Sequence, residues 1–125
     1  MISYNTFFFD TYALIELGKR NPHYEPYSKN VRIVLSQLNL MELSYFLLRE
    51  KRAHEIDEIF SFLSRFTVPY TKEILIEAAK MKYAFRKERL SYVDCIGYLI
   101  AQKHQVKFLT GDGKFEHKEN VEFVR

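Results

Sequence analysis

The chain has little of several residue types, and each shortage narrows the class of protein. Its 125 residues contain one cysteine, three prolines, four glycines and no tryptophan. A single cysteine, Cys95, excludes an internal disulfide and supplies too few ligands for a cysteine-based zinc site, which indicates a reducing, cytoplasmic setting. Few glycines and prolines, beside 47% hydrophobic and 28% charged residues, exclude a disordered chain and favour an ordered globular protein.

Long hydrophobic runs are also missing. A stretch such as IGYLIA at 96–101 is far shorter than the roughly 20 residues that a membrane-spanning helix needs. The N-terminus has no basic segment followed by an apolar one, so we expect a protein that is neither exported nor inserted into a membrane. The length predicts a single domain over residues 1–125. A net charge of +3 and an isoelectric point near 8.9 permit a polyanionic partner without requiring one.

Strand and helix patterns alternate along the sequence. NTFFF at 5–9 is typical of a buried strand, and RIVLS at 32–36, VKFLT and VEFVR indicate three more short strands. About six helices are predicted between them, over residues 11–19, within 21–30, and over 38–51, 53–66, 72–88 and 91–104. This alternation predicts an α/β fold, a three-layer α/β/α sandwich around a small, mainly parallel sheet of four to five strands.

Two of the predicted helices have a clear apolar face. Helical spacing places one inward stripe in the helix over 38–51, made of Leu40, Leu43, Phe46 and Leu47. A second stripe is predicted in the helix over 53–66, made of Ile56, Ile59, Phe60 and Leu63. The helix over 91–104 is apolar on nearly every side, which predicts burial between the sheet and other helices.

Four carboxylates stand where the predicted elements meet one edge of the sheet. Asp10 directly follows the first strand, and Asp112 lies just past the strand VKFLT. Glu42 lies early in the helix after the second strand, and Asp94 lies in the first turn of the apolar helix over 91–104. Because open α/β sheets bind ligands at the carboxyl ends of their strands, we expect the four acids to converge at that edge.

Each acid taken alone has a structural explanation. Asp10 can be a helix N-cap, and Asp94 completes SYVD, a pattern similar to a capping box. Asp112 lies in the turn sequence TGDG, and Glu42 can face solvent. The combination favours a site, because four neighbouring carboxylates repel one another severely unless they bind hard cations. Oxygen ligands alone favour Mg²⁺ or Mn²⁺ over zinc, and such ions promote phosphodiester hydrolysis.

The chain resembles the PIN domain family, and specifically its VapC-like toxin ribonucleases of the archaeal type, in the ordered segments FFFDTYALI, LNLMELSYFL, LSYVDCIGYLIA and KFLTGDGKFE with NVEFV. The resemblance covers essentially the whole chain and implies a small α/β/α sandwich that cleaves RNA endonucleolytically with a metal. It also implies a homodimer and a small antitoxin whose C-terminal segment blocks the acidic site. A non-catalytic PIN-like module for RNA binding or assembly is the alternative.

The same resemblance assigns roles to the four acids. Asp10, Glu42, Asp94 and Asp112 correspond to the family's catalytic acids. Asp10, Asp94 and Asp112 are the implied ligands of Mg²⁺ or Mn²⁺. Glu42 is implied either as a further ligand or as the group that orients the attacking water.

Neighbouring positions extend the resemblance and also depart from it. Thr11 and Thr110 correspond to hydroxyl residues that orient a carboxylate or water. Family members often carry a further acid two residues after the position of Asp112, where this chain has Lys114. Whether the site holds one or two metal ions therefore stays open, and so does whether Glu116 contributes to it.

Two basic clusters are candidates for RNA contacts. Arg49 and Arg52 lie at the end of the helix over 38–51, and Lys82 and Arg86 lie near the end of the helix over 72–88. Cations with aromatic residues between them can follow a phosphate backbone and stack on bases. Solvated helix ends, where cations suit the helix dipole, are the alternative. We expect the aromatic residues Tyr45, Phe46 and Tyr83 to serve the core or an interface rather than base stacking.

Overall fold

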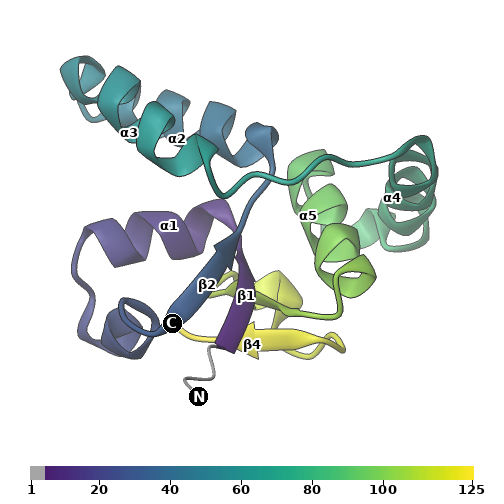
Figure 1. Cartoon of the computed structure of the whole chain (residues 1–125). Helices are drawn as coiled ribbons and strands as arrows, with labels where there is room; N and C mark the ends of the chain where they lie inside the picture. Colours follow the sequence, from purple (N-terminus) through teal and green to yellow (C-terminus); the bar gives the residue numbers. More distant parts are fainter. Residues whose placement is uncertain (1–4) are drawn as a thin grey trace.

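A four-stranded parallel sheet with helices on both faces forms the centre of the computed structural model, which describes residues 5–125 (Figure 1). The strands are β1 (Asn5–Phe9), β2 (Val31–Val34), β3 (Lys107–Thr110) and β4 (Val121–Phe123). Their order across the sheet is β2-β1-β3-β4, and every neighbouring pair is parallel. The predicted three-layer α/β/α sandwich is confirmed, with four strands.

The helices that connect the strands cover both faces of the sheet, the first three along the chain on one face and the last two on the other. The α-helices between residues 5 and 125 are α1 (Thr11–Gly18), α2 (Gln37–Arg49), α3 (Ile56–Ser64), α4 (Lys72–Ala84) and α5 (Tyr92–Lys103). Short 3₁₀ helices are η1 (Pro22–Tyr27), η2 (Ala53–Glu55), η3 (Arg86–Glu88) and η4 (Gly113–Phe115). In the part of the chain that the structure describes, no helix is long and apolar enough to cross a membrane.

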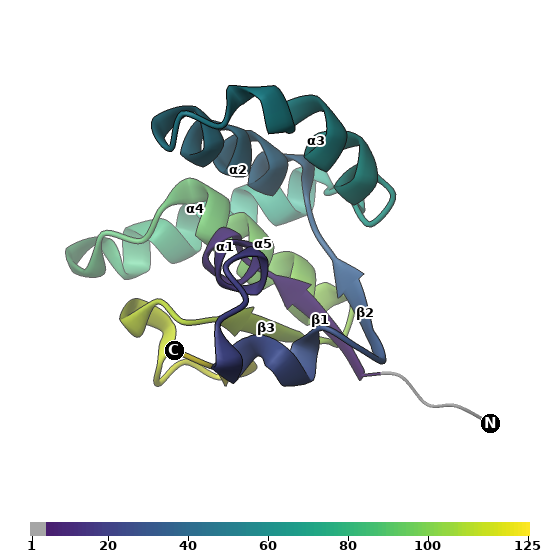
Figure 2. The ribbon, with the colours of Figure 1, turned by 90° about the vertical axis from the view of Figure 1, so that its left-hand side faces the viewer.

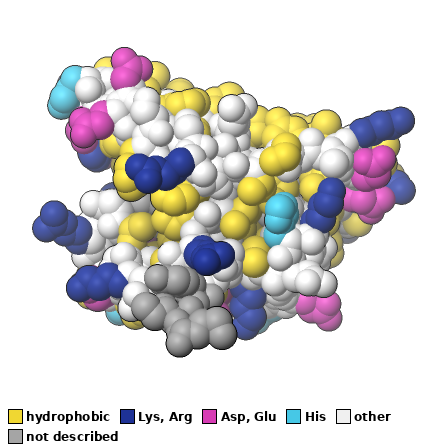
Figure 3. All heavy atoms as spheres, viewed as in Figure 1, with side chains coloured by type: hydrophobic (Ala, Val, Ile, Leu, Met, Phe, Trp, Pro, Cys, Tyr) yellow, Lys and Arg dark blue, Asp and Glu magenta, His cyan; other side chains and the backbone are white. Residues whose placement is uncertain are grey.

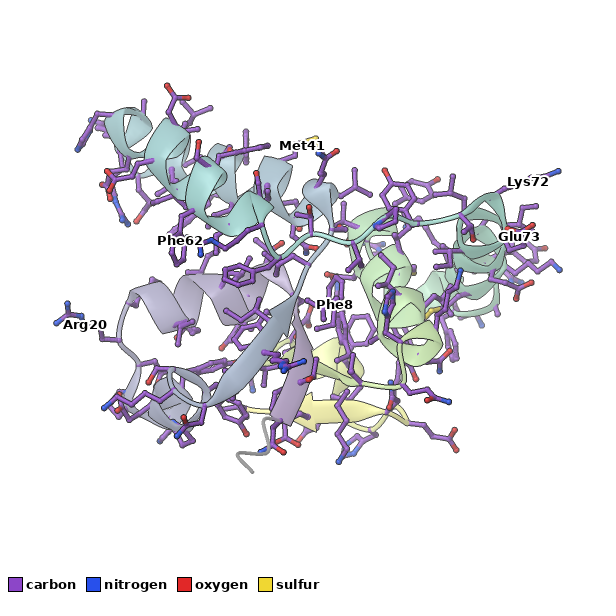
Figure 4. The ribbon with its side chains drawn as sticks, in the orientation of Figure 1. Phe8, Arg20, Met41, Phe62, Lys72 and Glu73 are labelled. Carbon is purple, nitrogen blue, oxygen red and sulfur yellow. The ribbon has the colours of Figure 1, made fainter. Side chains whose placement is uncertain are left out.

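The three consecutive phenylalanines of β1 are buried on both faces of the sheet. Phe8 packs with α4 and α5, while Phe7 and Phe9 pack with α1 and α2 on the other face. The side chain of Phe8 lies between β1 and α5 (Figure 4), and its ring stacks on Phe108 with centroids 5.8 Å apart. A parallel strand covered by helices on both faces reads as a continuous apolar run, which explains this sequence.

The ends of two helices differ from the predicted bounds. The helix predicted over 72–88 ends at Ala84, because Phe85 has φ −103° and ψ 29° and Arg89 is left-handed with φ 57°. The helix predicted over 53–66 divides into η2 and α3. The chain therefore turns sharply between α4 and α5, at residues 85–91.

Some predicted inward residues are not buried. Phe60 of α3 is 37% exposed, which corrects its assignment to the inward stripe. Ile56, Ile59 and Leu63 are partly buried against the core, and Phe60 lies one residue away from that narrow stripe. Phe46 of α2 is only half-buried. Because α3 packs at the periphery, it has no fully buried residue.

Candidate functional site

Two of the four predicted acids follow strands of the sheet, and the other two belong to helices. Asp10 follows β1 directly, and Asp112 follows β3 by two residues. Glu42 belongs to α2, and Asp94 is the third residue of α5. The negative charges act on one another, because Asp94 and Asp112 both raise the pKa of Asp10, and Glu42 and Asp112 both raise the pKa of Asp94. The fold thus brings all four acids into one electrostatic cluster.

Asp10 is the most deeply buried of the four acids. It is 2% exposed, and its Oδ1 accepts a hydrogen bond of 2.7 Å from the backbone N–H of Ala13, so it is also the N-cap of α1. Its Oδ2 accepts a short hydrogen bond from the hydroxyl of Thr110. Burial raises the pKa of Asp10 to about 8, against the lowering effect of these two hydrogen bonds. The carboxylate of Asp10 is therefore both the N-cap of α1 and part of the candidate site.

Asp94 projects from the first turn of α5. Ser91 is the N-cap, and its Oγ accepts a hydrogen bond of 3.0 Å from the backbone N–H of Asp94. Burial, followed by the charge of Glu42, raises the pKa of Asp94 to about 6. The charge of Lys114 partly opposes this shift, which places that cation beside the acids. Raised pKa values in neighbouring carboxylates are typical of functional sites, which makes this cluster the candidate site.

Asp112 and Thr110 fix the geometry at the end of β3. The backbone N–H of Asp112 donates to Oγ1 of Thr110 at 3.0 Å, and Oδ1 of Asp112 accepts from the backbone N–H of Lys114 at 3.0 Å. Since the hydroxyl of Thr110 also donates to Asp10, this fully buried threonine joins two of the acids. The orienting role of Thr110 stays a prediction that these contacts are consistent with.

Glu42 is held by a hydrogen-bond chain that begins inside α2. Thr11 donates its hydroxyl to Oε1 of Glu42 at 2.5 Å and accepts from Nδ2 of Asn39 at 3.2 Å. Oδ1 of Asn39 accepts from the backbone N–H of Ser36 at 3.0 Å and from its hydroxyl at 2.9 Å. Each donor is directed by the next group, so the orientation of Glu42 is determined by this chain.

Ser36 and Asn39 are residues that the sequence analysis did not select. Both are almost completely buried, although their polar side chains cost free energy when buried without partners. They form a capping box at the start of α2. The signal in the sequence is the spacing of Asn39 three residues before Glu42, which places both on one helical face.

The donor set of the site suits a hard divalent cation. Carboxylate and hydroxyl oxygens are the atoms present, and Mg²⁺ and Mn²⁺ prefer oxygen ligands. The pKa values of Asp10 and Asp94 are raised by burial and by repulsion between the acids, and a bound cation would offset both effects. Among residues 5–125, however, no group of three or more aspartate, glutamate, histidine or cysteine side chains is arranged so that it could hold a metal ion. Metal binding by Asp10, Asp94 and Asp112 stays a prediction.

The remaining candidates lie outside the acidic cluster. Glu116 is exposed, with its Oε1 3.9 Å from Nε2 of His117. Arg49 and Arg52 line hollows beside α1, whereas Lys82 and Arg86 belong to the end of α4 and to η3. The two basic clusters are therefore separate surfaces, on opposite sides of the molecule in Figure 1.

The aromatic residues near these clusters are exposed. Tyr83 is 70% exposed and Tyr45 is 63% exposed, so of the two expected roles, core or interface, the core role is wrong for both, and the interface role stays a prediction. Both lie on helix faces that the rest of the chain leaves uncovered. Phe46 is half-buried and lines a groove beside α1.

Comparison with known families defines the class of protein. A family model described as the PIN domain matches residues 7–121, and the chain belongs to this family. The resemblance found in the sequence is thereby confirmed. Among curated proteins, no sequence matches the chain significantly.

Solved structures of VapC toxins have the same fold. VapC20 from Mycobacterium tuberculosis, described as a toxin that cleaves the sarcin-ricin loop, has a TM-score of 0.70 and 20% identity, over 95% of this chain and 99% of that one. VapBC2 from Rickettsia felis, bound to a DNA fragment from its promoter, has a TM-score of 0.69 and 18% identity, over 96% and 99%. A toxin-antitoxin complex from Klebsiella pneumoniae has a TM-score of 0.70 and 18% identity, over 92% and 94%. The chain thus has the VapC-like form of the PIN fold.

Proposed function

We propose that this protein is a metal-dependent endoribonuclease that hydrolyses phosphodiester bonds of RNA, and that it is the toxin of a VapBC-like toxin-antitoxin pair in the cytoplasm. The observation that carries the proposal is the electrostatic cluster of four acids, in which burial and mutual repulsion raise the pKa of two. The VapC-like fold supports the choice of RNA, because VapC20 is described as a toxin that cleaves the sarcin-ricin loop.

In this proposal Asp10, Asp94 and Asp112 hold Mg²⁺ or Mn²⁺. The bound cation would polarise the phosphoryl group, lower the pKa of the attacking water and stabilise the leaving oxygen. Thr110 keeps the carboxylate of Asp10 in place through its hydroxyl, and the backbone N–H of Lys114 does the same for Asp112. These hydrogen bonds preorganise the acids before substrate arrives.

Glu42 either orients the attacking water or serves as a further ligand of the metal ion. The hydroxyl of Thr11 occupies one lone pair of Oε1 at 2.5 Å, which leaves the other oxygen of the carboxylate for a water or a cation. Because Asn39 in turn directs Thr11, the carboxylate of Glu42 is oriented from inside α2. No side-chain nucleophile is needed for this reaction.

An apolar groove between α1, α2 and α3 is the proposed site of the antitoxin. The groove has a volume of about 530 Å³, and its apolar lining includes Leu14, Leu17, Phe46 and Phe62. Phe62 points from α3 toward α1 (Figure 4). Figure 3 shows further exposed hydrophobic side chains along the upper edge of the molecule. Solved structures of the same fold include toxin-antitoxin complexes, which supports a protein partner here.

A homodimer is also part of the proposal. Leu75 and Ile76 are exposed on α4, away from the α1 to α3 groove. A second copy that covered these side chains would remove apolar surface from water.

The test is cleavage of structured and single-stranded RNAs by purified protein with Mg²⁺, with Mn²⁺ and with a chelator, beside the Asp94→Asn variant. Cleavage that requires metal and is lost in the variant would establish the nuclease. Folded protein that binds RNA but neither binds metal nor cleaves, and that is free of a copurified inhibitor, would instead establish the non-catalytic module.

A further inference from the structure

We propose that the turn between α4 and α5 binds a single-stranded segment of the RNA substrate, with the rings of Tyr83 and Tyr92 stacking on its bases. We call this surface the α4–α5 corner and define it by Lys82, Tyr83, Arg86 and Tyr92. The inference rests on the proposed nuclease function and deepens it. It assigns substrate binding to one of the two basic clusters, and it adds a residue, Tyr92, that the sequence analysis did not select.

The two tyrosines of the corner are exposed and each has a cation on its ring. Tyr92 is 67% exposed, and Nζ of Lys82 lies 4.6 Å from its ring centroid. Tyr83 is 70% exposed, and Cζ of Arg86 lies 4.5 Å from its ring centroid. Aromatic rings beside cations are the platforms that proteins use for unpaired nucleotides, because the ring stacks on a base and the cation binds the phosphate.

The corner adjoins the acidic cluster. Tyr92 is the first residue of α5 and precedes Asp94 by two positions. Lys114 connects the two regions, since its Nζ donates to the carbonyl of Arg89 at 3.1 Å while its backbone N–H donates to Asp112 at 3.0 Å. Figure 2 shows the end of α4 projecting past the ends of β1 and β3, the two strands that Asp10 and Asp112 follow. A strand of RNA bound at the corner would therefore continue across the acidic edge.

The charge of the corner suits a polyanion. Residues 82–92 contain four cations, Lys82, Arg86, Lys87 and Arg89, and a single acid, Glu88. The acid is already paired, because Oε1 of Glu88 lies 2.7 Å from Nζ of Lys118. The local excess of positive charge is thus available to phosphate groups, which supply most of the affinity in nucleic-acid binding.

The other basic cluster has less charge to offer. Arg52 donates from Nε and Nη2 to the two carboxylate oxygens of Glu55, at 2.6 and 2.8 Å. Arg49 lies over Tyr45 with its Cζ 5.9 Å from the ring centroid, and the next residue is the acid Glu50. A bidentate pair of this kind neutralises the guanidinium. The end of α2 therefore has arginine and tyrosine as the α4–α5 corner does, but less of its positive charge is unpaired.

Exposed rings select a single strand over a duplex. Bases in a double helix are stacked on one another, so they cannot stack on a protein ring. Unpaired bases can do so, and each stacked base contributes about 1–3 kcal/mol of binding free energy.

The test measures binding without cleavage. A labelled single-stranded oligoribonucleotide is titrated with protein in chelator and followed by fluorescence anisotropy, for the wild type and for Tyr92→Ala, Tyr92→Phe and Tyr45→Ala. We expect Tyr92→Ala to raise Kd roughly 5- to 150-fold and Tyr92→Phe to retain most of the affinity. Tyr45→Ala is the matched control, an exposed tyrosine beside an arginine on α2, and it should bind as the wild type does.

Two further measurements separate the possible results. A duplex of the same sequence should show no loss with Tyr92→Ala, and Arg86→Gln should lower the salt dependence of single-strand binding. Wild-type affinity in Tyr92→Ala, or an equal loss in Tyr45→Ala, would overturn the inference. Cleavage with Mg²⁺ is measured in parallel, so that active protein with unchanged Tyr92→Ala binding refutes the corner alone, while absent cleavage with the expected binding pattern refutes only the nuclease.

Discussion

Two helix pairs flank the acidic edge, and they differ in what they expose. The pair α2 and α3 presents an apolar groove, and α3 has no fully buried residue. The pair α4 and α5 presents exposed tyrosines with cations on their rings, while α5 itself is deeply buried beside the sheet. Each pair also contributes one acid, Glu42 from α2 and Asp94 from α5. The acids that the two pairs contribute therefore lie between an apolar groove on one side and exposed tyrosines with cations on the other.

The largest effect on activity is expected from a substitution of Asp94, the acid that the pair α4 and α5 contributes. Asp94→Asn preserves the shape of the side chain but removes the charge that a cation would bind. Because a bound metal ion supplies several kcal/mol to the transition state, we expect kcat/KM for RNA cleavage to fall by about 1000-fold. Circular dichroism of the variant checks that the fold is intact. Normal cleavage by folded Asp94→Asn protein with Mg²⁺ would place the chemistry elsewhere.

The acid of the first pair depends on its hydrogen-bond chain. Thr11→Val removes the hydroxyl that donates to Glu42 and leaves the volume of the side chain almost unchanged. Loss of such an orienting group costs about 10- to 100-fold in activity or metal affinity. Thr11→Ser, which keeps the hydroxyl, is the control and should stay close to the wild type. Equal activity in all three proteins would show that Glu42 works without Thr11.

Packing is also expected to differ between the pairs. At Gly97 of α5 an added Cβ would lie 2.7 Å from Cε1 of Phe8, whose ring is fully buried and stacked on Phe108. Gly97→Ala should therefore lower the free energy of unfolding by about 1–3 kcal/mol. Phe60→Ser on the peripheral α3 should lower it less, by about 1 kcal/mol, because the Phe60 side chain is 37% exposed in the folded protein. Urea denaturation measures both, and a costlier Phe60→Ser would reverse the order of the two helices.

Much of this arrangement follows from local sequence patterns. The aromatic run before Asp10 predicts a buried strand. Asp10 and Asp112 follow strands, Asp94 lies in the first turn of α5, and Glu42 lies in the first half of α2. Helical spacing could not predict the exposure of Tyr83 or Phe60, because periodicity identifies a stripe but not the width that a neighbouring helix covers. The chain from Ser36 through Asn39 was missed because a capping box explains both residues locally. The second role of Asn39, its hydrogen bond to the hydroxyl of Thr11, depends on the fold, which brings Thr11 beside α2.

Asp10 lies just past the end of β1, and its titration tests whether the two helix pairs enclose it. Burial raises its pKa from 3.8 to about 8, so the folded protein without metal holds a proton that the unfolded chain has lost. Stability should then fall as pH rises from about 4 to about 8, by up to about 1 kcal/mol per pH unit, and should be restored by Mg²⁺. Below pH 4 both states hold the proton, and above pH 8 both have lost it, so this contribution is flat outside the window.

The matched protein for this measurement is Asp10→Asn, which cannot ionise. Thermal unfolding in chelator across the same pH range should show a flatter profile than the wild type, with greater stability at pH 7 to 8 and no gain from Mg²⁺. Asp94 contributes in the same direction over the narrower interval up to about pH 6, so the difference between the two proteins above pH 6 belongs to Asp10. Identical profiles for the two proteins would mean that water reaches Asp10 and that the two helix pairs do not close over it.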